Sequence, residues 1–245
     1  MNWTRDIGWV FLLFVVVAWI GGLLIGDDVD APAIRKCADK TLPPALVDVL
    51  SRLPAADAEA ARAGDGCLIT WAHEATHFVN SRHSDGKQRG FYLLDGVAWK
   101  VPLPRNTRLA HVADAIPAKH RGKTYKTYLI EAQRDWQDIA IYPLDEAVAY
   151  TSGCITRREL GWERRQETDR FCIELLVYSK YAVDEVCRRE GSGYPKDDLR
   201  ALLELMVARA RLAIEDFDKQ PYADALAGIG EELLADTEGS DATAR

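Results

Sequence analysis

The chain has 245 residues, of which 48% are hydrophobic, so it is long enough to bury the core of one medium-sized domain. Its formal net charge of −7 argues against a nucleic-acid-binding protein, because such proteins present a basic surface to the phosphates. The sequence contains neither a glycine-rich phosphate loop nor an internal repeat.

An almost wholly apolar stretch, residues 7–25, comes first along the chain. Its 19 residues are close to the roughly 20 that a helix needs to cross a bilayer. The apolar core of a secretory signal peptide is shorter, at about 7–15 residues. We therefore predict that residues 1–28 form an uncleaved transmembrane anchor, with a cleaved signal segment as the alternative.

The residues that flank this stretch indicate on which side of the membrane the domain lies. Arg5 precedes the stretch, whereas three aspartates follow it: Asp27, Asp28 and Asp30. The positive-inside rule then predicts a cytoplasmic amino terminus. The domain is expected outside the cytoplasm, anchored to the membrane in a periplasmic or extracellular position, or secreted if the segment is cleaved.

Cysteine usage is compatible with an oxidising compartment, and no pair has the C-x-x-C spacing of a redox site. Two of the five cysteines, Cys172 and Cys187, lie about 22 Å apart on one expected helix and cannot bridge each other. A Cys37–Cys67 bridge and a bridge from Cys154 to either of those two remain open, as does a fully reduced set.

Residues 29–44 form a short polar linker with three prolines, and helical periodicity begins after it. Residues 45–53 and 55–62 are predicted helices separated by Pro54. A Gly-Asp-Gly turn at residues 64–66 then leads into an apolar run that continues as a third helix.

This third helix carries the motif His-Glu-Ala-Thr-His at residues 73–77. The imidazoles of His73 and His77 are four residues apart, so they face the same side of the helix and can reach one tetrahedral zinc ion at about 2.0–2.1 Å. Glu74 is offset by one residue, where it can take a proton from a zinc-bound water. The alternative is a helix with two unrelated histidines and a chance glutamate.

The next segments predict a small β element followed by short helical pieces. Residues 91–101 are predicted to form a β-hairpin, because two β-rich runs flank an Asp-Gly pair. Residues 107–116 are predicted to form a short helix, capped by Asn106 or Thr107. Residues 125–130 fit either a helical turn or a strand.

Three longer helices are expected after these: residues 141–153, with Gly153 as the stop, residues 163–189 and residues 197–217. Residues 221–245 form an acidic, partly disordered tail. The fold class is therefore mainly α with a small β-hairpin, an α+β domain that spans residues 45–220.

A catalytic zinc usually has three protein ligands and one open position, so a third ligand is required. Here the sequence resembles the zincin metallopeptidases, which carry HExxH on their active-site helix. In the gluzincin branch the third ligand is a glutamate on a second helix downstream, and the segment LDEAVAY looks like that helix. The resemblance implies Glu146 as the ligand, with Tyr150 one turn later as a phenol that stabilises an oxyanion. Alternatively, Asp145 and Glu146 are helix-terminal acids and Tyr150 is a core residue.

His83 is the second candidate for the third ligand. It follows His77 by six residues, which is the spacing of the metzincin pattern HExxHxxGxxH, with Asn80 in the place of the glycine. Metzincins also need a methionine turn beneath the metal. The chain has only Met1 and Met206, and Met206 lies inside an amphipathic helix, which favours Glu146.

The segment from HEATH to LDEAVAY, about eighty residues, also resembles a group of bacterial extracytoplasmic proteins that carry a peptidase-like motif. Zincins usually place a β-sheet before the HExxH helix, whereas residues 31–66 of this chain look helical. We therefore expect a reduced zincin-like catalytic domain after the N-terminal membrane helix.

Together these observations predict a zinc metallopeptidase that acts outside the cytoplasm on a peptide or protein substrate. His73, His77 and Glu146 hold Zn²⁺ in this prediction, and Glu74 and Tyr150 are catalytic. The chain is predicted to contact a membrane through its N-terminal helix and to bind no nucleic acid.

The alternative prediction is a non-catalytic, membrane-tethered envelope protein with a vestigial or structural metal site. A third hypothesis is an enzyme that hydrolyses a cell-wall amide. Three further side chains are weaker candidates for the site: Tyr142, His111 and His120.

Overall fold

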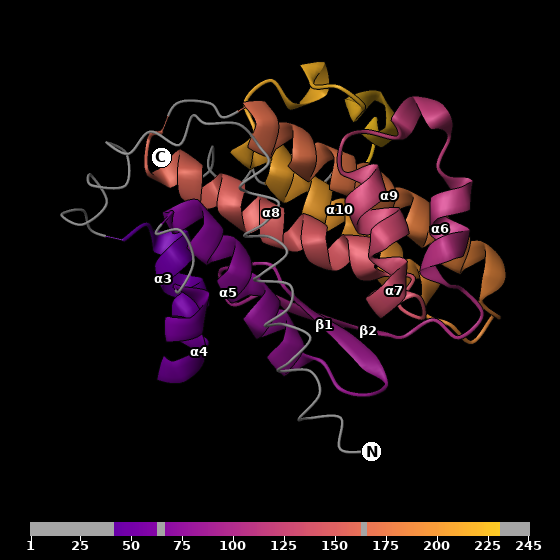
Figure 1. The fold of residues 1–245 in the computed structure, drawn as a ribbon, viewed down its shortest axis with the longest axis horizontal. Coiled ribbons are helices and arrows are strands. Elements are labelled where there is room, and N and C mark those ends of the chain that lie inside the picture. Colours follow the sequence, from indigo (N-terminus) through magenta and orange to yellow (C-terminus); the bar gives the residue numbers. More distant parts are fainter. Residues whose placement is uncertain (1–41, 63–66, 163–165, 231–245) are drawn as a thin grey trace, which may run out of the picture.

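The computed structural model describes residues 42–62, 67–162 and 166–230 (Figure 1). This part is mainly helical with a two-stranded antiparallel sheet, which confirms the predicted combination of helices and one β-hairpin. The expected membrane stretch, residues 7–25, lies outside the described residues. Among the helices that are described, none is long and apolar enough to cross a membrane.

The elements follow one another in three groups along the chain. The first group is helical: α3 (Pro44–Ser51), α4 (Ala55–Ala61) and α5 (Leu68–His83). The second contains the hairpin and short helices: β1 (Gln88–Tyr92), β2 (Ala98–Pro102), α6 (Leu109–Ala115), the 3-10 helix η1 (Ala118–His120), the π-helix η2 (Lys126–Glu131) and α7 (Gln133–Trp136). The third contains the long helices and two 3-10 turns: α8 (Tyr142–Glu159), α9 (Gln166–Arg189), α10 (Lys196–Ala213), η3 (Phe217–Lys219) and η4 (Ala223–Leu226).

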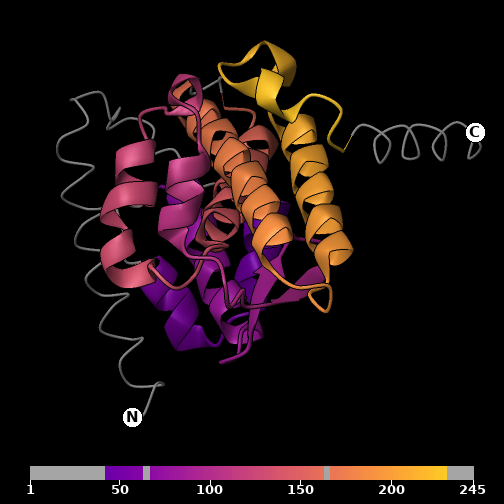
Figure 2. The same ribbon diagram turned by 90° about the vertical axis from the view of Figure 1, so that its right-hand side faces the viewer.

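Helix α8 is the central element of the fold, and 14 of its 18 residues are buried. It packs against α5 on one side and against α9 and α10 on another. Helices α9 and α10 lie side by side, in orange to yellow in Figure 2. The expected stop at Gly153 is wrong, because α8 continues to Glu159. A Cβ atom at Gly153 would lie 3.1 Å from Cγ2 of Ile69 on α5, so the glycine serves the close approach of the two helices.

Helix α5 is oriented by its apolar face. One stripe of this helix is buried with α3 and α4 in a small core: Leu68, Ala72, Ala75 and Val79. These positions recur at helical spacing, so they bury one side of α5. The opposite side, which carries the two histidines of the HExxH motif, is thereby turned towards α8.

The predicted hairpin forms, and Phe91 pairs with Trp99 in its antiparallel sheet. Its first strand begins at Gln88, three residues earlier than predicted. The outer edge of β1 is bound by α5, because the backbone N–H of Tyr92 donates to Oδ1 of Asn80 at 2.7 Å. The hairpin is therefore fixed against the same helix that carries the HExxH motif.

Several local predictions were resolved by tertiary contacts. Helix α6 begins at Leu109, and the expected caps Asn106 and Thr107 instead bind the carboxylate of Glu190 at the end of α9. Residues 125–130, which fitted either a helical turn or a strand, lie almost entirely in the π-helix η2. Packed structure also continues past residue 220, where Leu226 of η4 is fully buried.

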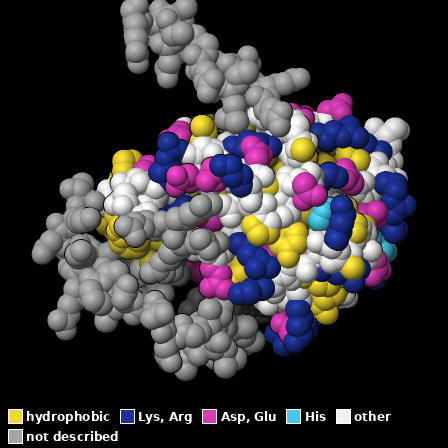
Figure 3. All heavy atoms as spheres, turned by 90° about the horizontal axis from the view of Figure 1, so that it is seen from above, with side chains coloured by type: hydrophobic (Ala, Val, Ile, Leu, Met, Phe, Trp, Pro, Cys, Tyr) yellow, Lys and Arg dark blue, Asp and Glu magenta, His cyan; other side chains and the backbone are white. Residues whose placement is uncertain are grey.

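The cysteines of α8 and α9 are free thiols in the structure: Cys154, Cys172 and Cys187. The last two lie on one helix, as predicted. Cys37 lies outside the described residues, so the bridge to Cys67 that the sequence left open is not described. On the face shown in Figure 3, acidic and basic side chains are interspersed, and no continuous patch of either sign stands out.

Replacing Gly122 with alanine is expected to lower the free energy of unfolding by about 1–3 kcal/mol, because a Cβ atom there overpacks the core. That atom would lie 2.0 Å from Cδ of Glu174, which is fully buried. The carboxylate cannot move easily, since it accepts hydrogen bonds from the backbone N–H and Oγ1 of Thr124 and from Nε of Arg170.

Urea unfolding of the full chain measures this change. Gly191→Ala is the control, because nothing lies within 4 Å of the added Cβ, and its stability should stay within about 0.5 kcal/mol of the wild type. Equal stability of both variants would show that the Gly122 loop moves freely.

Candidate metal centre

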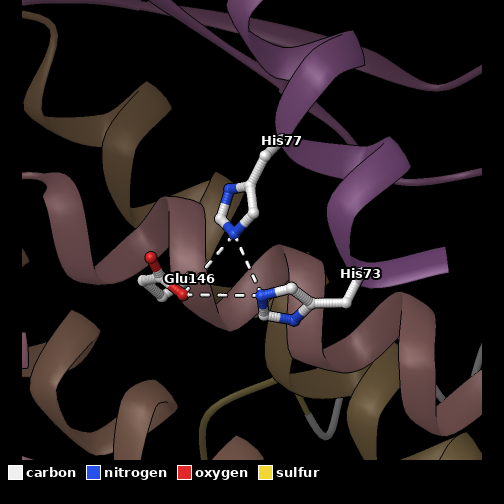
Figure 4. Close-up of side chains that lie close together, drawn as sticks. All are labelled: His73, His77 and Glu146. Carbon is white, nitrogen blue, oxygen red and sulfur yellow. Dashed lines mark hydrogen bonds and ion pairs between the residues drawn. The ribbon is translucent and has the colours of Figure 1, made fainter. Parts of the chain in front are cut away.

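Helices α5 and α8 bring three potential metal ligands together (Figure 4). The Nε2 atoms of His73 and His77 are 3.1 Å apart. Oε2 of Glu146 lies 3.8 Å from Nε2 of His73 and 3.5 Å from Nε2 of His77. The two histidines stand one turn apart on α5, and the carboxylate approaches them from the first turns of α8.

The separations of these atoms fit a bound metal ion. Three atoms separated by 3.1, 3.5 and 3.8 Å share a point that is about 2.0 Å from each of them. Imidazole and carboxylate ligands bind tetrahedral divalent metal ions at about 2.0–2.2 Å. The cluster of His73, His77 and Glu146 is largely buried and can hold a metal ion.

The other candidate ligand, His83, lies away from this cluster. Helix α5 continues through His83 without the turn that the metzincin pattern requires after residue 80. Six residues of helix rise about 9 Å, so His83 cannot share a metal ion with His77. Its ring stacks on Tyr92 instead, with the centroids 6.2 Å apart. The structure therefore places Glu146 with the two histidines.

Asp145 is a part of the site that the sequence did not reveal, because a first-turn acid on a helix has an ordinary explanation in the helix dipole. Its Oδ2 atom accepts a hydrogen bond from Nδ1 of His77 at 2.8 Å. Oδ1 accepts from the amide of Asn80 at 2.7 Å, and Nη2 of Arg89 lies 2.8 Å from Oδ2. The only signal in the sequence was that Asp145 precedes Glu146.

Tyrosine side chains surround the other side of the cluster. Tyr142 donates a hydrogen bond to Oε1 of Glu146 at 2.7 Å. The ring of Tyr150 meets that of His73 edge-on at 4.6 Å, and its hydroxyl lies 3.1 Å from that of Tyr128. Tyr128 was not predicted; it comes from η2, and π-helical turns are frequent at functional sites.

Burial and the nearby acids control which of these groups carry a proton. Burial raises the pKa of Tyr150, and the charges of Glu146 and Glu74 raise it further, so the phenol remains a hydrogen-bond donor. Glu74 is partly exposed on α5. It follows His73 directly in the chain, and its charge raises the pKa of both His73 and Tyr150.

The three potential ligands themselves form a site for positive charge. Burial and then the charge of His77 lower the pKa of His73, which leaves that imidazole neutral. Burial alone would lower the pKa of His77, but the carboxylates of Glu146 and Asp145 outweigh it and raise the pKa well above the ordinary value. The pKa of Glu146 is lowered, because the attraction of the histidines exceeds the effect of burial. A metal ion would take the place of the proton that this arrangement attracts.

The weaker candidates His111 and His120 lie elsewhere. His111 accepts a hydrogen bond from the backbone of Arg108 at the start of α6, and His120 on η1 bonds the hydroxyl of Tyr181.

No family model, curated protein or solved structure matches this chain. The chemistry of the site is therefore the basis for a functional assignment.

Proposed function

We propose that this protein is a zinc-dependent metallopeptidase, with His73, His77 and Glu146 as the zinc ligands. The observation that carries the proposal is the convergence of their three ligand atoms around a common point at metal–ligand distance. Two imidazole nitrogens and one carboxylate oxygen are a ligand set that catalytic zinc sites use. A partly exposed glutamate, Glu74, stands next to this set on the same helix.

A catalytic site accounts for this geometry better than a structural one. Structural zinc sites are closed by four protein ligands, whereas catalytic sites keep one position open. Among the described residues, the group that can hold a metal ion has three members, and the side chain of His73 is 16% exposed. This observation favours an enzyme over a non-catalytic envelope protein with a structural metal.

Each neighbouring side chain has a defined role in peptide hydrolysis. Bound zinc supplies Lewis acidity, which polarises a carbonyl group and makes water a stronger acid. Glu74 takes the proton of the attacking water and returns it to the leaving amine. Tyr150 donates a hydrogen bond to the oxyanion of the tetrahedral intermediate. Tyr142 holds Oε1 of Glu146, which leaves Oε2 directed at the histidines.

The proposed setting of this activity follows from the sequence. Residues 1–28 would anchor the chain in a membrane, and the positive-inside rule, with Arg5 ahead of the apolar stretch and acidic residues after it, favours a domain outside the cytoplasm. A peptide or protein in the periplasm or extracellular space is then the substrate. If the segment is cleaved, the same domain acts as a secreted peptidase.

Metal removal tests the proposed function. We expect the purified full chain to hold about one zinc ion and to cleave an unfolded protein substrate such as casein. Incubation with 1,10-phenanthroline should abolish cleavage, and added zinc should restore it, while the non-chelating isomer 1,7-phenanthroline should have no effect. Zinc content is measured by elemental mass spectrometry on the same samples.

Three results would contradict the metallopeptidase proposal in different ways. A chain that holds zinc but cleaves neither casein, a peptide library nor cell-wall peptidoglycan would have a structural metal site. A chain that holds zinc and releases amines only from cell-wall peptidoglycan would hydrolyse a cell-wall amide. A chain that holds no zinc after zinc is offered would show that the cluster is not a metal centre.

A further inference from the structure

Two consecutive acids of α8 contact opposite nitrogens of one imidazole. Oδ2 of Asp145 accepts from Nδ1 of His77 at 2.8 Å, while Oε2 of Glu146 lies 3.5 Å from Nε2 of the same ring. A neutral imidazole carries its proton on one nitrogen. A hydrogen bond from Nδ1 to Asp145 therefore leaves the lone pair of Nε2 free to bind a metal ion and also fixes the plane of the ring.

Asp145 can act in this way only if its charge is balanced. Its side chain is 3% exposed, and a carboxylate in such surroundings needs hydrogen bonds and a cation. Asn80 supplies one hydrogen bond to Oδ1, and the guanidinium of Arg89 lies 2.8 Å from Oδ2. Arg89 belongs to β1, so the balancing cation comes from the hairpin and not from either of the helices that carry the potential ligands.

The guanidinium of Arg89 is itself held in place. Its side chain is 11% exposed, and the guanidinium carbon lies 5.6 Å from the centre of the Trp136 ring. That ring stacks on Tyr142, with the planes 12° apart and the centroids 4.9 Å apart. Strand β1, which carries Arg89, is also held by Asn80 of α5. The side-chain oxygen of Asn80 accepts a hydrogen bond from the backbone N–H of Tyr92, and the side-chain amide of Asn80 donates one to Asp145. One side chain, Asn80, therefore ties the hairpin, α5 and α8 together.

We propose that Asp145 and Arg89 are positioning residues for the metal centre: Asp145 orients His77, and Arg89 acts through Asp145 by holding its carboxylate in place. The inference rests on the proposed metal site, and it does not depend on which bond the enzyme hydrolyses. It makes the β-hairpin a part of the metal centre. The hairpin then has a function in this mainly helical fold beyond covering the core.

The zinc affinity of three variants of the full chain tests this proposal. Competition with a chromophoric chelator gives the zinc dissociation constant of Asp145→Asn, Arg89→Met and the double variant. Each single change is expected to weaken zinc binding by about 10–100-fold, the range found for residues that orient metal ligands. The double variant should bind zinc about as weakly as Asp145→Asn alone, because Arg89 acts through Asp145.

A matched control separates this effect from the loss of any ion pair. Arg200 forms a pair of similar length with Asp197, at 2.9 Å, but the two side chains are 53% and 97% exposed. Arg200→Met should therefore bind zinc as the wild type does. Arg89→Met leaves the buried carboxylate of Asp145 without its cation and can therefore fail to fold. The double variant leaves no buried charge unpaired, so its zinc affinity tests the proposal in that case.

A spectroscopic readout distinguishes positioning from general stability. In the cobalt-substituted protein, visible absorption reports the geometry of the bound ion. Asp145→Asn should change the position or intensity of these bands. The thermal unfolding midpoint of its metal-free form should also fall, because the change leaves the buried guanidinium of Arg89 without its carboxylate. A variant that is merely less stable would lower the midpoint and leave the cobalt spectrum unchanged.

The possible outcomes separate this proposal from the proposed function. The positioning proposal would be overturned if Asp145→Asn bound zinc as tightly as the wild type does. It would also be overturned if the loss of zinc affinity in Arg89→Met added in full to the loss in Asp145→Asn. If zinc binding changes as expected but the wild type hydrolyses no peptide, the positioning proposal stands and the peptidase does not. If the wild type binds no zinc, both are overturned.

Discussion

Replacing Glu74 with glutamine is expected to lower kcat for peptide hydrolysis by about 10²–10⁴-fold, the range for loss of a general base. Zinc content should remain at about one ion per chain, because the glutamine has nearly the same size and Glu74 is not among the three potential ligands. The amide cannot accept a proton from water at neutral pH, so only the chemical step is impaired. Both quantities are measured on one preparation, with kcat from a fluorogenic peptide and zinc from elemental mass spectrometry.

Glu59→Gln is the matched control for this experiment, because Glu59 is an exposed glutamate in a helix, on α4. It should leave kcat, KM and zinc content unchanged. Retention of most of the activity by the zinc-bound Glu74→Gln protein would mean that another group takes the proton. Loss of zinc together with activity would mean that the substitution disturbs the metal centre.

Replacing Glu146 with alanine should weaken zinc binding by more than the about 10–100-fold expected for residues that only orient the ligands. The reason is direct: the change removes one of the three proposed ligand atoms and the negative charge that would balance the ion. Zinc content of the purified chain and its affinity in chelator competition measure the effect. Glu146→Gln keeps the size of the side chain and removes its charge, so it tests the same point if the alanine variant is unstable.

His83→Ala is the counterpart of this variant, since His83 is the competing ligand in the sequence pattern. We expect it to keep full zinc content, because α5 continues through His83 and the ring stacks on Tyr92. The reverse result, with zinc lost from His83→Ala and kept in Glu146→Ala, would assign the third ligand to His83. It would require α5 to unwind before its last turn.

Much of the secondary structure could be predicted because it depends on short-range patterns. The HExxH helix and the hairpin near Gly96 were both found from periodicity and from turn residues, and both form. The predicted helix end at Gly153 failed for a physical reason. A glycine at a helix end and a glycine at a close helix crossing look alike in a sequence, and only the distance to Ile69 distinguishes them.

The candidate site was predictable only where its parts lie close together in the sequence or match a known pattern. Tyr128 was missed because η2 has no clear periodicity, and its approach to Tyr150 spans 22 residues. Arg89 was missed because a single arginine in a strand carries no signal. Its pairing with Asp145 exists only after the hairpin packs beside α5 and α8.

The sequence by itself determined the spacing of His73, Glu74 and His77, because one turn of helix places both imidazoles on the same face whatever surrounds it. It also determined the candidate carboxylate, Glu146, through a resemblance to a known pattern. Only the tertiary structure decided that this carboxylate meets the histidines and that Asp145 holds Nδ1 of His77 across 68 residues of chain. The physical reason is that α5 and α8 approach each other closely, with Gly153 against Ile69, and the distance between their polar groups is set by that packing.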